Sequence, residues 1–332
     1  MKQKHAIYMI IGIIMVVLAF FLIADRNPKS SPQDEIVNTT PNGEIKVTKD
    51  GVKYIIDPAK IRNGGPPKDG IPSIDSPKFV SVSDADEWIE DNELVLALEY
   101  KGIKRVYPLQ ILVWHEIVND NIAGDPILIT YCPLCGSGIA YERKINGEDV
   151  EFGTSGKLYN SNLVMYDRKT DTYWSQIGGQ AIVGELTGMK LKEISIDTVV
   201  WRDWKSAHPD SKVLSRDTGF NRQYGSDPYG NYYEDSFLMF PVESQDDRIH
   251  AKTVVFGIEV NGMFKAYREL DLTETPSITD TLGGVNIKVE REGTGVVKIT
   301  NTDTGEKIVK ERDFWFAWYA FHPNTQLYGF DE

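Results

Sequence analysis

Two segments of this chain recur later in the sequence, in the same order. The matching pairs are LEYKGIKRVY (98–107) with IEVNGMFKAY (258–267), and WRDWKSAHPDSKVL (201–214) with WFAWYAFHPNTQLY (315–328). Ordered internal similarity is the signature of a duplicated structural unit, which one chance resemblance would not produce. The sequence therefore predicts one folded domain over residues 46–332, with similar halves near 93–215 and 252–330.

The first half carries the residue patterns of short strands. Residues 93–107 are rich in strand formers and have Lys101-Gly102 at their centre, which predicts a β-hairpin. A second hairpin is predicted over 140–152, centred on Asn146-Gly147. We therefore expect an α+β fold that is mainly β, with two duplicated halves.

Three short helices are expected between these strands. One should begin near Asp84 in the DADEW sequence, capped by Ser83 or by Asp84 itself. The apolar stretch 108–120 predicts a largely buried helix that starts at Pro108, a residue suited to the first helical turn. A third is predicted over 201–207, ending where His208 precedes a proline.

The N-terminal region has the pattern of a membrane anchor. Residues 6–24 contain no charge, and a run of about twenty apolar residues spans a bilayer. Lys2 and Lys4 precede this run, so the positive-inside rule places residues 1–5 in the cytoplasm. A cleaved signal peptide is the alternative, but Leu22 stands where a cleavage site needs a small residue. We expect a single-pass protein of the cell membrane with an N-terminal transmembrane helix, a flexible tether over 25–45, and an extracytoplasmic domain.

The charge balance limits the classes of partner. The formal net charge is −13, and no basic patch offsets the acidic excess. Nucleic acid is therefore not expected as a partner, because its recognition depends on clustered lysine and arginine. The membrane is the one partner that the sequence predicts, through the N-terminal helix.

The two cysteines of the chain lie together in the sequence TYCPLCGSG. Cys132 and Cys135 stand between two apolar runs, PILIT (126–130) and SGIAY (137–141), so they are expected in a tight turn between two strands. Cysteines at this spacing can form a disulfide, hold a metal ion or exchange electrons. The second half contains no cysteine, so this chemistry belongs to the first half alone.

His115 and Glu116 are the polar residues expected nearest to the cysteines. On a helix over 108–120 they would share one face with Asn119, and a buried face must provide partners for such groups. One interpretation is a ligand or general base that faces the cysteine turn. The other is structural hydrogen bonding to neighbouring turns. His208 and His322 occupy equivalent His-Pro positions in the two halves, which indicates a structural role for both.

Three functions remain open for the cysteine turn. The first is thiol redox chemistry, with Cys132 attacking, Cys135 resolving and His115 as a nearby base. The second is a copper or zinc site, in which Cys132 and Cys135 would need His115 and Glu116, or Met165, or a second chain, to complete the ligands. The third is a structural disulfide in a non-enzymatic surface scaffold. The redox partner and electron donor are not identified by the sequence.

Polar segments after the cysteines have two interpretations as well. Residues 160–167 (NSNLVMYD), followed by Gln176, could bind through fixed hydrogen bonds, but asparagine, serine and aspartate also favour turns. The aromatic and Asp-rich stretch 216–233 is expected to be a packed surface loop. A calcium site is the less favoured alternative there, since the spacing of an EF-hand is absent.

The chain resembles the domain-of-unknown-function 3179 family of bacterial and archaeal proteins. The stretches that carry the resemblance are GGPPKDGIPSID (64–75), YPLQILVWHEIVND (107–120), TYCPLCGSG (130–138), FGTSG (152–156), NSNLVMYDRKT (160–170) and YGSDPYGNYY (224–233). The resemblance implies family membership and brings no activity with it. The roles given to Cys132, Cys135 and His115 therefore rest on residue chemistry alone.

Overall fold

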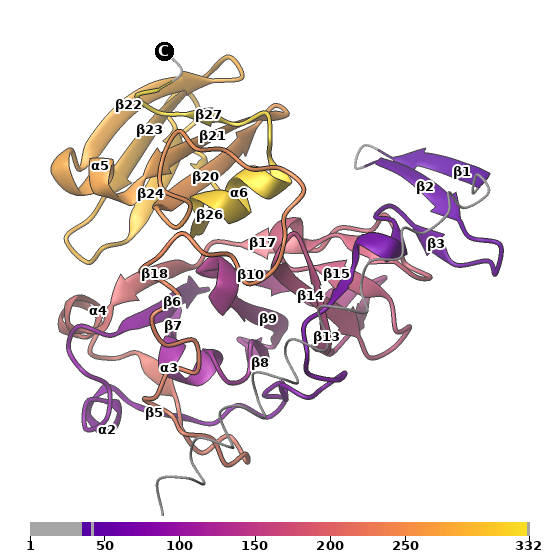
Figure 1. The fold of residues 1–332 in the computed structure, drawn as a ribbon. Helices are drawn as coiled ribbons and strands as arrows, with labels where there is room; N and C mark the ends of the chain where they lie inside the picture. The colour runs from indigo at the N-terminus through magenta and orange to yellow at the C-terminus, as the bar shows by residue number, and fades with distance from the viewer. Residues whose placement is uncertain (1–34, 41–42, 331–332) are drawn as a thin grey trace, which may run out of the picture.

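The computed structural model describes residues 35–40 and 43–330, and it is mainly β (Figure 1). The predicted transmembrane segment 6–24 lies outside the described residues. Within the described residues, no helix is both long enough and apolar enough to cross a membrane. The chain folds into small sheets whose strands pair mostly with antiparallel neighbours.

The first half contains two neighbouring sheets. One has the order β18 (Asp197–Val200), β6 (Leu94–Tyr100), β7 (Ile103–Pro108), β19 (Lys212–Leu214) and β5 (Phe79–Ser81). The other has the order β17 (Lys192–Ile194), β10 (Ser137–Glu142), β9 (Asp125–Cys132) and β8 (Ile117–Ile122). Three short helices accompany these strands, namely α2 (Val82–Ala85), α3 (Leu109–Leu112) and α4 (Trp201–Ala207).

The second half repeats this order of strands. One sheet runs β26 (Lys310–Phe314), β20 (Val254–Val260), β21 (Met263–Arg268) and β27 (Gln326–Leu327). The other runs β22 (Ser277–Leu282), β23 (Val285–Arg291), β24 (Val297–Asn301) and β25 (Lys307–Ile308). Helices α5 (Glu269–Glu274) and α6 (Trp315–Phe321) occupy the places of α3 and α4. The two parallel strand pairings also correspond, because β19 pairs with β7 in the first half and β27 pairs with β21 in the second.

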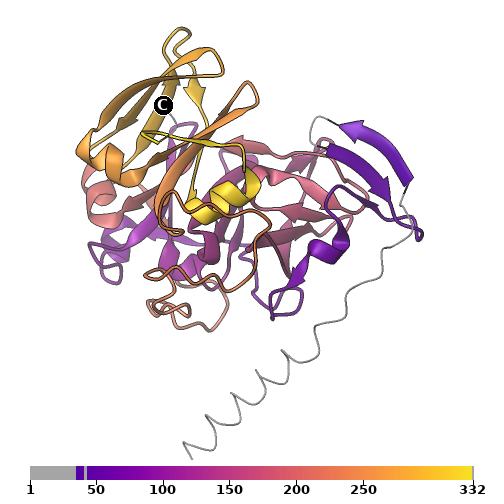
Figure 2. The same cartoon turned by 45° about the horizontal axis from the view of Figure 1, so that its top comes forward.

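A third sheet has no counterpart in the second half. Its order is β1 (Glu35–Thr40), β2 (Gly43–Val47), β3 (Lys53–Tyr54), β16 (Ala181–Val183), β15 (Tyr173–Ser175), β14 (Asn162–Asp167), β13 (Phe152–Tyr159) and β4 (Arg62–Asn63). Four of its strands, β13 to β16, are inserted between β10 and β17, together with the small β11–β12 hairpin (Lys144–Ile145 and Glu148–Asp149), and the other four precede β5. Residues 302–306 alone fill the corresponding gap between β24 and β25. Figure 2 shows the β1–β2 hairpin, in indigo, projecting to one side.

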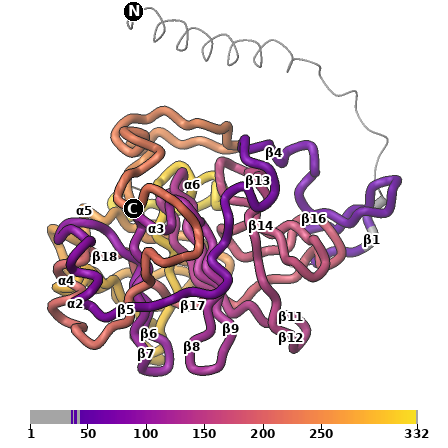
Figure 3. The backbone as a smooth tube through the Cα atoms, turned by 90° about the horizontal axis from the view of Figure 1, so that it is seen from below, coloured from indigo at the N-terminus to yellow at the C-terminus, as the bar shows by residue number. Residues whose placement is uncertain are grey.

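Residues 215–253 join the two halves without forming a strand or a helix (Figure 3). The segment crosses α3 and the turn that follows it, where the Trp114 indole Nε1 donates a hydrogen bond to the Ser226 carbonyl at 3.1 Å. Residues 216–233 of this segment were expected to form a packed surface loop, and part of that stretch is buried. Tyr232, for example, is 3% exposed.

The local patterns predicted the hairpins and one helix correctly. β6 and β7 pair as expected through a turn at Lys101 and Gly102, which have φ values of 50° and 78°. The β11–β12 turn likewise contains Asn146 and Gly147 at positive φ. α4 spans Trp201–Ala207, and His208 caps its end.

The predicted helix over 108–120 is wrong beyond its first turn. α3 ends at Leu112, and the chain then enters strand β8, which pairs with β9 from Ile117 to Ile122. Glu116 has φ 58°, a left-handed conformation that ends any helix. The sequence Ile117-Val118 has high strand propensity, and pairing with β9 overrides the apolar helical pattern. The proposed common face of His115, Glu116 and Asn119 therefore does not exist.

The first helix also begins earlier than predicted. α2 starts at Val82, and Ser81 rather than Ser83 or Asp84 is its N-cap. Ser81 and Asp84 form a capping box, in which each side chain accepts a hydrogen bond from the other's backbone N–H. Asp84 is therefore the third residue of the helix and takes part in the capping box, but it is not the N-cap residue.

Candidate functional site

The cysteine turn is a strand-to-strand connection, as the sequence predicted. β9 ends at Cys132, a 3-10 turn covers Pro133–Cys135, and β10 begins at Ser137, which pairs directly with Cys132. Gly136 closes the turn with φ 62°. Cys132 is 1% exposed and Cys135 is fully buried, and both are free thiols. The turn thus holds two sulfurs that are not bonded to each other within a hydrophobic cluster that also includes Phe314 and Phe316 of the second half.

Both thiols converge on one backbone carbonyl of the inserted sheet. The Cys132 and Cys135 sulfurs lie 3.9 and 3.5 Å from the Ser161 carbonyl oxygen and donate to it. Ser161 and Asn160 form the β13–β14 turn with φ values of 62° and 49°. Left-handed backbone at two successive non-glycine residues is strained, and such strain is typical of functional sites. The turn aims its carbonyl at the thiol pair.

A buried polar network extends from Cys135 into the sheets. The Asn162 amide donates to the Cys135 sulfur at 3.5 Å and to the Gln176 side-chain oxygen at 2.6 Å, and it accepts from the Ile177 N–H at 3.0 Å. Gln176 in turn donates to the Thr130 hydroxyl at 3.1 Å. These contacts fix Asn162 so that its N–H stabilises negative charge on Cys135.

The linking segment covers the other side of the cysteine turn. The Tyr232 hydroxyl donates to the Leu134 carbonyl at 3.1 Å, between the two cysteines. The Lys252 ammonium, whose side chain is fully buried, donates to the Tyr232 carbonyl and forms an ion pair with Asp235 at 3.1 Å. The same ammonium lies 3.5 Å from the centre of the Tyr232 ring. Lys252 therefore clamps Tyr232 over the thiols.

Burial and negative neighbours set the protonation state of Cys135. Burial raises the pKa of the Cys135 thiol well above its ordinary value, and the nearby Cys132 and Asp313 raise it further. The hydrogen bond from Asn162 acts in the opposite direction. Cys135 is therefore a thiol at neutral pH while the site is closed, and a thiol reacts far more slowly than a thiolate.

His115 is buried, but its ring nitrogens are directed elsewhere. Nδ1 donates to the Pro72 carbonyl at 2.7 Å, and Nε2 accepts from the Tyr224 hydroxyl at 2.5 Å. Burial lowers the pKa of His115 to about 4, so the imidazole is neutral. The hydroxyl of Thr218 lies 2.5 Å from that of Tyr224 and completes the chain of hydrogen bonds. His115 thus ties the linking segment to the first half, and neither ring nitrogen contacts a cysteine.

Glu116 is brought next to the cysteine strand. Its carbonyl accepts a hydrogen bond from the N–H of Tyr131, the residue before Cys132, at 2.8 Å. Its side chain is 8% exposed, and burial raises the pKa of its carboxyl group to about 8. Burial is also the main cause of the raised pKa of Tyr229, and the charges of Glu116 and Cys132 add to it. Glu116 and Cys132 therefore share Tyr229 as a neighbour.

Asp313 is a site residue that the sequence analysis missed. It lies on β26 of the second half, is fully buried, and neither carboxylate oxygen has a hydrogen-bond partner among the described residues. Burial raises the pKa of Asp313 to about 7, and its charge contributes to the raised pKa of Cys135. No local pattern could have found it, because about 180 residues separate it from Cys135 along the chain.

The predicted metal site is only partly assembled. Among the described residues, no group of three or more histidine, cysteine, aspartate and glutamate side chains is arranged to hold an ion. Cys132 and Cys135 lie together, His115 is hydrogen-bonded away from them, and Met165 is buried in the same core cluster. Copper or zinc binding by Cys132, Cys135, His115 and Glu116 remains a prediction.

A cavity of about 560 Å³ adjoins the cysteine turn. Its walls include Tyr131 and Gly136, which flank the two cysteines, together with Tyr233, Arg312 and Phe314. The cavity is therefore separated from the sulfurs by the residues of the turn itself. It provides an open space beside the residues that flank the cysteines.

Substitution of Gly136 by alanine should destabilise the fold by about 2–4 kcal/mol, because it combines a left-handed conformation with overpacking. A Cβ at Gly136 would lie 2.9 Å from the Phe314 ring. Gly124→Ala is the matched control, since Gly124 also has positive φ, at 85°, but a Cβ there meets nothing within 4 Å. Urea unfolding of both variants measures the difference. Equal losses would contradict the close contact between Phe314 and the turn.

Comparison with known proteins places the chain in a family. The family described as "Protein of unknown function (DUF3179)" matches residues 68–325, which include the cysteine turn, the β13–β14 turn and Asp313. No curated protein and no solved structure was found to match. The match extends over most of both halves, as the resemblance of the separate motifs had implied. The chain belongs to the DUF3179 family.

Proposed function

We propose that this chain is a membrane-tethered, extracytoplasmic thiol redox protein that cycles Cys132 and Cys135 between dithiol and disulfide. The observation that carries the proposal is the convergence of both thiols on the Ser161 carbonyl, at 3.9 and 3.5 Å. Two sulfurs that share one acceptor lie close to each other, so a bond between them requires little rearrangement of the turn. Outside the cytosol, a neighbouring pair of cysteines has access to oxidants.

The reaction partner that fits this chemistry is a protein or small molecule that carries a disulfide. The Cys132 thiolate attacks one partner sulfur, the partner S–S bond breaks, and the departing thiolate takes up the proton that Cys132 gave up. Cys135 then attacks the Cys132 sulfur, and the mixed disulfide breaks. The partner leaves as a dithiol, so two electrons and two protons have moved from this chain to the partner. Cys135 is assigned as the resolving thiol because burial and the neighbouring Cys132 and Asp313 raise its pKa well above the ordinary value.

We assign Glu116, in place of His115, as the group that holds the Cys132 proton between these steps. Both ring nitrogens of His115 are already hydrogen-bonded, and burial lowers the pKa of His115 to about 4. Burial raises the pKa of Glu116 to about 8, and its carboxyl group shares Tyr229 as a neighbour with Cys132. A general base acts most efficiently when its pKa lies near the working pH. Asp313, whose pKa burial raises to about 7 and whose charge acts on Cys135, is assigned the corresponding role for Cys135.

Access to the thiols requires displacement of Tyr232. Lys252→Met removes the ammonium group that holds Tyr232 and Asp235, and it keeps the apolar stem of the side chain. A lost charged hydrogen bond favours opening by about 1–3 kcal/mol, so thiol labelling should accelerate roughly 10- to 100-fold. Stopped-time alkylation with mass detection measures the rate. Lys192→Met, at an exposed lysine paired with Glu142, should label at the wild-type rate; equal rates in all three proteins would argue against Lys252 as the clamp.

The order of attack is tested with single-cysteine variants and glutathione disulfide. Cys135→Ser should accumulate a stable mixed disulfide at Cys132, because the resolving thiol is missing. Cys132→Ser should react far more slowly, because the remaining thiol is fully buried and burial raises its pKa. If both variants trapped the mixed disulfide equally, the assignment of Cys132 as the attacking thiol would be wrong. No trapping by either would argue against the redox function itself.

Two further features of the sequence belong to this proposal. We infer that the halves near 93–215 and 252–330 arose by duplication, which is supported by their identical strand order and by the equivalent places of α4 and α6. The inserted sheet then gave the first half its β13–β14 turn and the acceptor for the thiols. Residues 6–24 are assigned as the anchor from their lack of charge alone. Retention of the full-length protein in washed membranes would support this assignment.

A further inference from the structure

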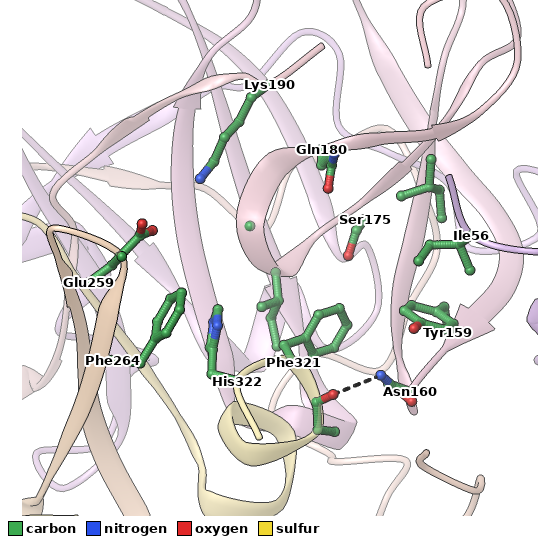
Figure 4. A pocket seen from close by; sticks show the side chains of 15 residues that line it. Ile56, Tyr159, Asn160, Ser175, Gln180, Lys190, Glu259, Phe264, Phe321 and His322 are labelled. Carbon is green, nitrogen blue, oxygen red and sulfur yellow. Dashed lines mark hydrogen bonds between the residues drawn. The ribbon is translucent and has the colours of Figure 1, made fainter. Parts of the chain in front are cut away.

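A second cavity lies where the inserted sheet meets the second half (Figure 4). It encloses about 480 Å³, and a smaller cavity of about 200 Å³ shares several of its wall residues, including Lys190, Glu259 and His322. The Asn160 amide donates to the Ala320 carbonyl at 3.0 Å and joins the two walls. This cavity does not include either cysteine, so it is separate from the thiol site.

Two opposite charges face this cavity from its two walls. Lys190 comes from the first half, and Glu259 comes from the β20–β21 hairpin of the second. Figure 4 shows both charged groups directed toward the same end of the cavity. Neither side chain forms an ion pair or hydrogen bond with any described residue. Glu193 and Glu311 also line the adjoining smaller cavity, and burial raises the pKa of both carboxyl groups although the charge of Lys190 acts to lower it. An unpaired cation and anion at one cavity end favour a ligand that carries both charges.

His322 adds an uncharged polar group beside these charges, and Ser175 adds one farther along the cavity, toward Ile56 (Figure 4). The His322 ring stacks on Phe264 at a centroid distance of 4.3 Å, and its Nε2 has no hydrogen-bond partner among the described residues. Burial lowers the pKa of His322 to about 3, so the ring is neutral. The Ser175 hydroxyl is likewise buried without a partner in the described chain. Buried polar atoms in folded proteins are nearly always satisfied, which points to a missing partner at this place.

The other end of the cavity is largely apolar. Ile56, Ile182, Tyr159 and Phe321 belong to its walls, and Figure 4 shows Ile56, Tyr159 and Phe321 at this end, with Ser175 nearby. Tyr159 and Phe321 meet edge to face, with their ring centroids 5.7 Å apart. A cavity with charged groups at one end and aliphatic and aromatic side chains at the other selects an amphipathic small molecule.

We propose that this cavity binds a small zwitterion with an apolar side chain, of the class of the apolar and aromatic α-amino acids. The carboxylate of the ligand pairs with Lys190, its ammonium group pairs with Glu259, and its side chain enters the apolar end near Tyr159 and Phe321. His322 completes the polar end, and Ser175 offers a hydroxyl near the apolar end.

The first half contains an equivalent cleft that serves as an internal control. Its walls include Glu99, Trp204 and His208, which correspond to Glu259, Trp318 and His322. Two lysines line this cleft, namely Lys298, which is hydrogen-bonded to Glu292, and Lys307. The cleft encloses about 200 Å³, against about 480 Å³ for the cavity between the inserted sheet and the second half. We expect the smaller volume to exclude the same ligand.

The proposal is tested by calorimetric titration of the full-length protein with L-phenylalanine and L-leucine. Phenethylamine lacks the carboxylate and 3-phenylpropionate lacks the ammonium group, and both should bind about tenfold or more weakly than L-phenylalanine. Lys190→Gln should weaken the binding of L-phenylalanine by a similar factor and leave the affinity for phenethylamine unchanged. Glu259→Gln should weaken the binding of L-phenylalanine and leave the affinity for 3-phenylpropionate unchanged. Glu99→Gln, in the equivalent cleft, should bind as the wild type does.

Each other outcome overturns the proposal. Absence of saturable binding by either amino acid would show that the cavity is not a site for this class. Binding that is insensitive to both Lys190→Gln and Glu259→Gln, or equally sensitive to Glu99→Gln, would place the ligand elsewhere. All three substituted residues are exposed, so the folded state is retained in the variants.

Discussion

Replacement of Glu116 by glutamine should remove a large part of the loss of stability that the wild-type protein shows as the pH rises, while the buried Asp313 accounts for another part. Burial raises the pKa of Glu116 from an ordinary 4.5 to about 8 in the folded chain. Below the ordinary pKa, both the folded and the unfolded states carry the proton, and the full stability is present. Between these two pKa values the unfolded chain ionises while the folded chain stays protonated, so the free energy of unfolding falls. Above about pH 8 the loss is complete.

The size of this effect follows from the difference between the pKa of Glu116 in the folded chain and its ordinary value. A pKa difference of this size corresponds to about 4–5 kcal/mol, which is a large part of the stability of a typical domain. Urea unfolding of the wild type and of Glu116→Gln at about pH 5 and about pH 9 measures it. The unfolding curves of the wild type and of Glu116→Gln should lie much closer together at the lower pH. At the higher pH the variant should be the more stable protein.

A matched variant separates Glu116 from general effects of charge. Glu259→Gln makes the same chemical change at an exposed glutamate and should keep the pH dependence of the wild type. If Glu116→Gln retained that dependence as well, Glu116 would not be the buried titrating group. Its assignment as the holder of the Cys132 proton would then fail.

Replacement of Asn162 by alanine is the second change with a large expected effect. It removes the donors to Cys135 and Gln176 and the acceptor for the Ile177 N–H, all within the buried network. The Gln176 oxygen and the Ile177 N–H would be left without these partners, and each such group costs about 1–3 kcal/mol. We therefore expect a loss of about 3–5 kcal/mol in the free energy of unfolding.

The control for Asn162 lies on a nearby strand. Asn121 on β8 is exposed, and Asn121→Ala should change stability by less than about 0.5 kcal/mol. Urea unfolding compares the two variants, and alkylation of Cys135 in Asn162→Ala gives a second readout. A small stability change in Asn162→Ala would contradict the role of this network in holding the cysteine turn.

Local sequence patterns were informative where local interactions decide the structure. Lys101-Gly102 and Asn146-Gly147 predicted two hairpin turns, because these residues accept positive φ. The strand–turn–strand arrangement at Cys132 was also predicted from a local pattern, namely the apolar β-like runs on either side of it. The helix over 108–120 failed because pairing of β8 with β9 is a tertiary interaction, and no helical periodicity reports it.

The composition of the site could be predicted only in part. Cys132, Cys135 and Glu116 are brought close together, as expected, but through a strand and a left-handed residue and not through a helix. The turn at Asn160 and Ser161 was interpreted as turn chemistry, which is correct, yet its carbonyl is also the acceptor for both thiols. Such contacts depend on how the inserted sheet packs on the first half.

The redox state of the cysteine pair tests the central claim most directly. Purified full-length protein is equilibrated in mixtures of reduced and oxidised dithiothreitol, quenched with acid, alkylated, and weighed by intact-mass spectrometry. The account predicts one reversible transition between a species with two labels and a species with none, and no such transition in Cys132→Ser. A pair that takes two labels in every mixture, or that remains unlabelled under strong reduction even in Lys252→Met, would contradict it.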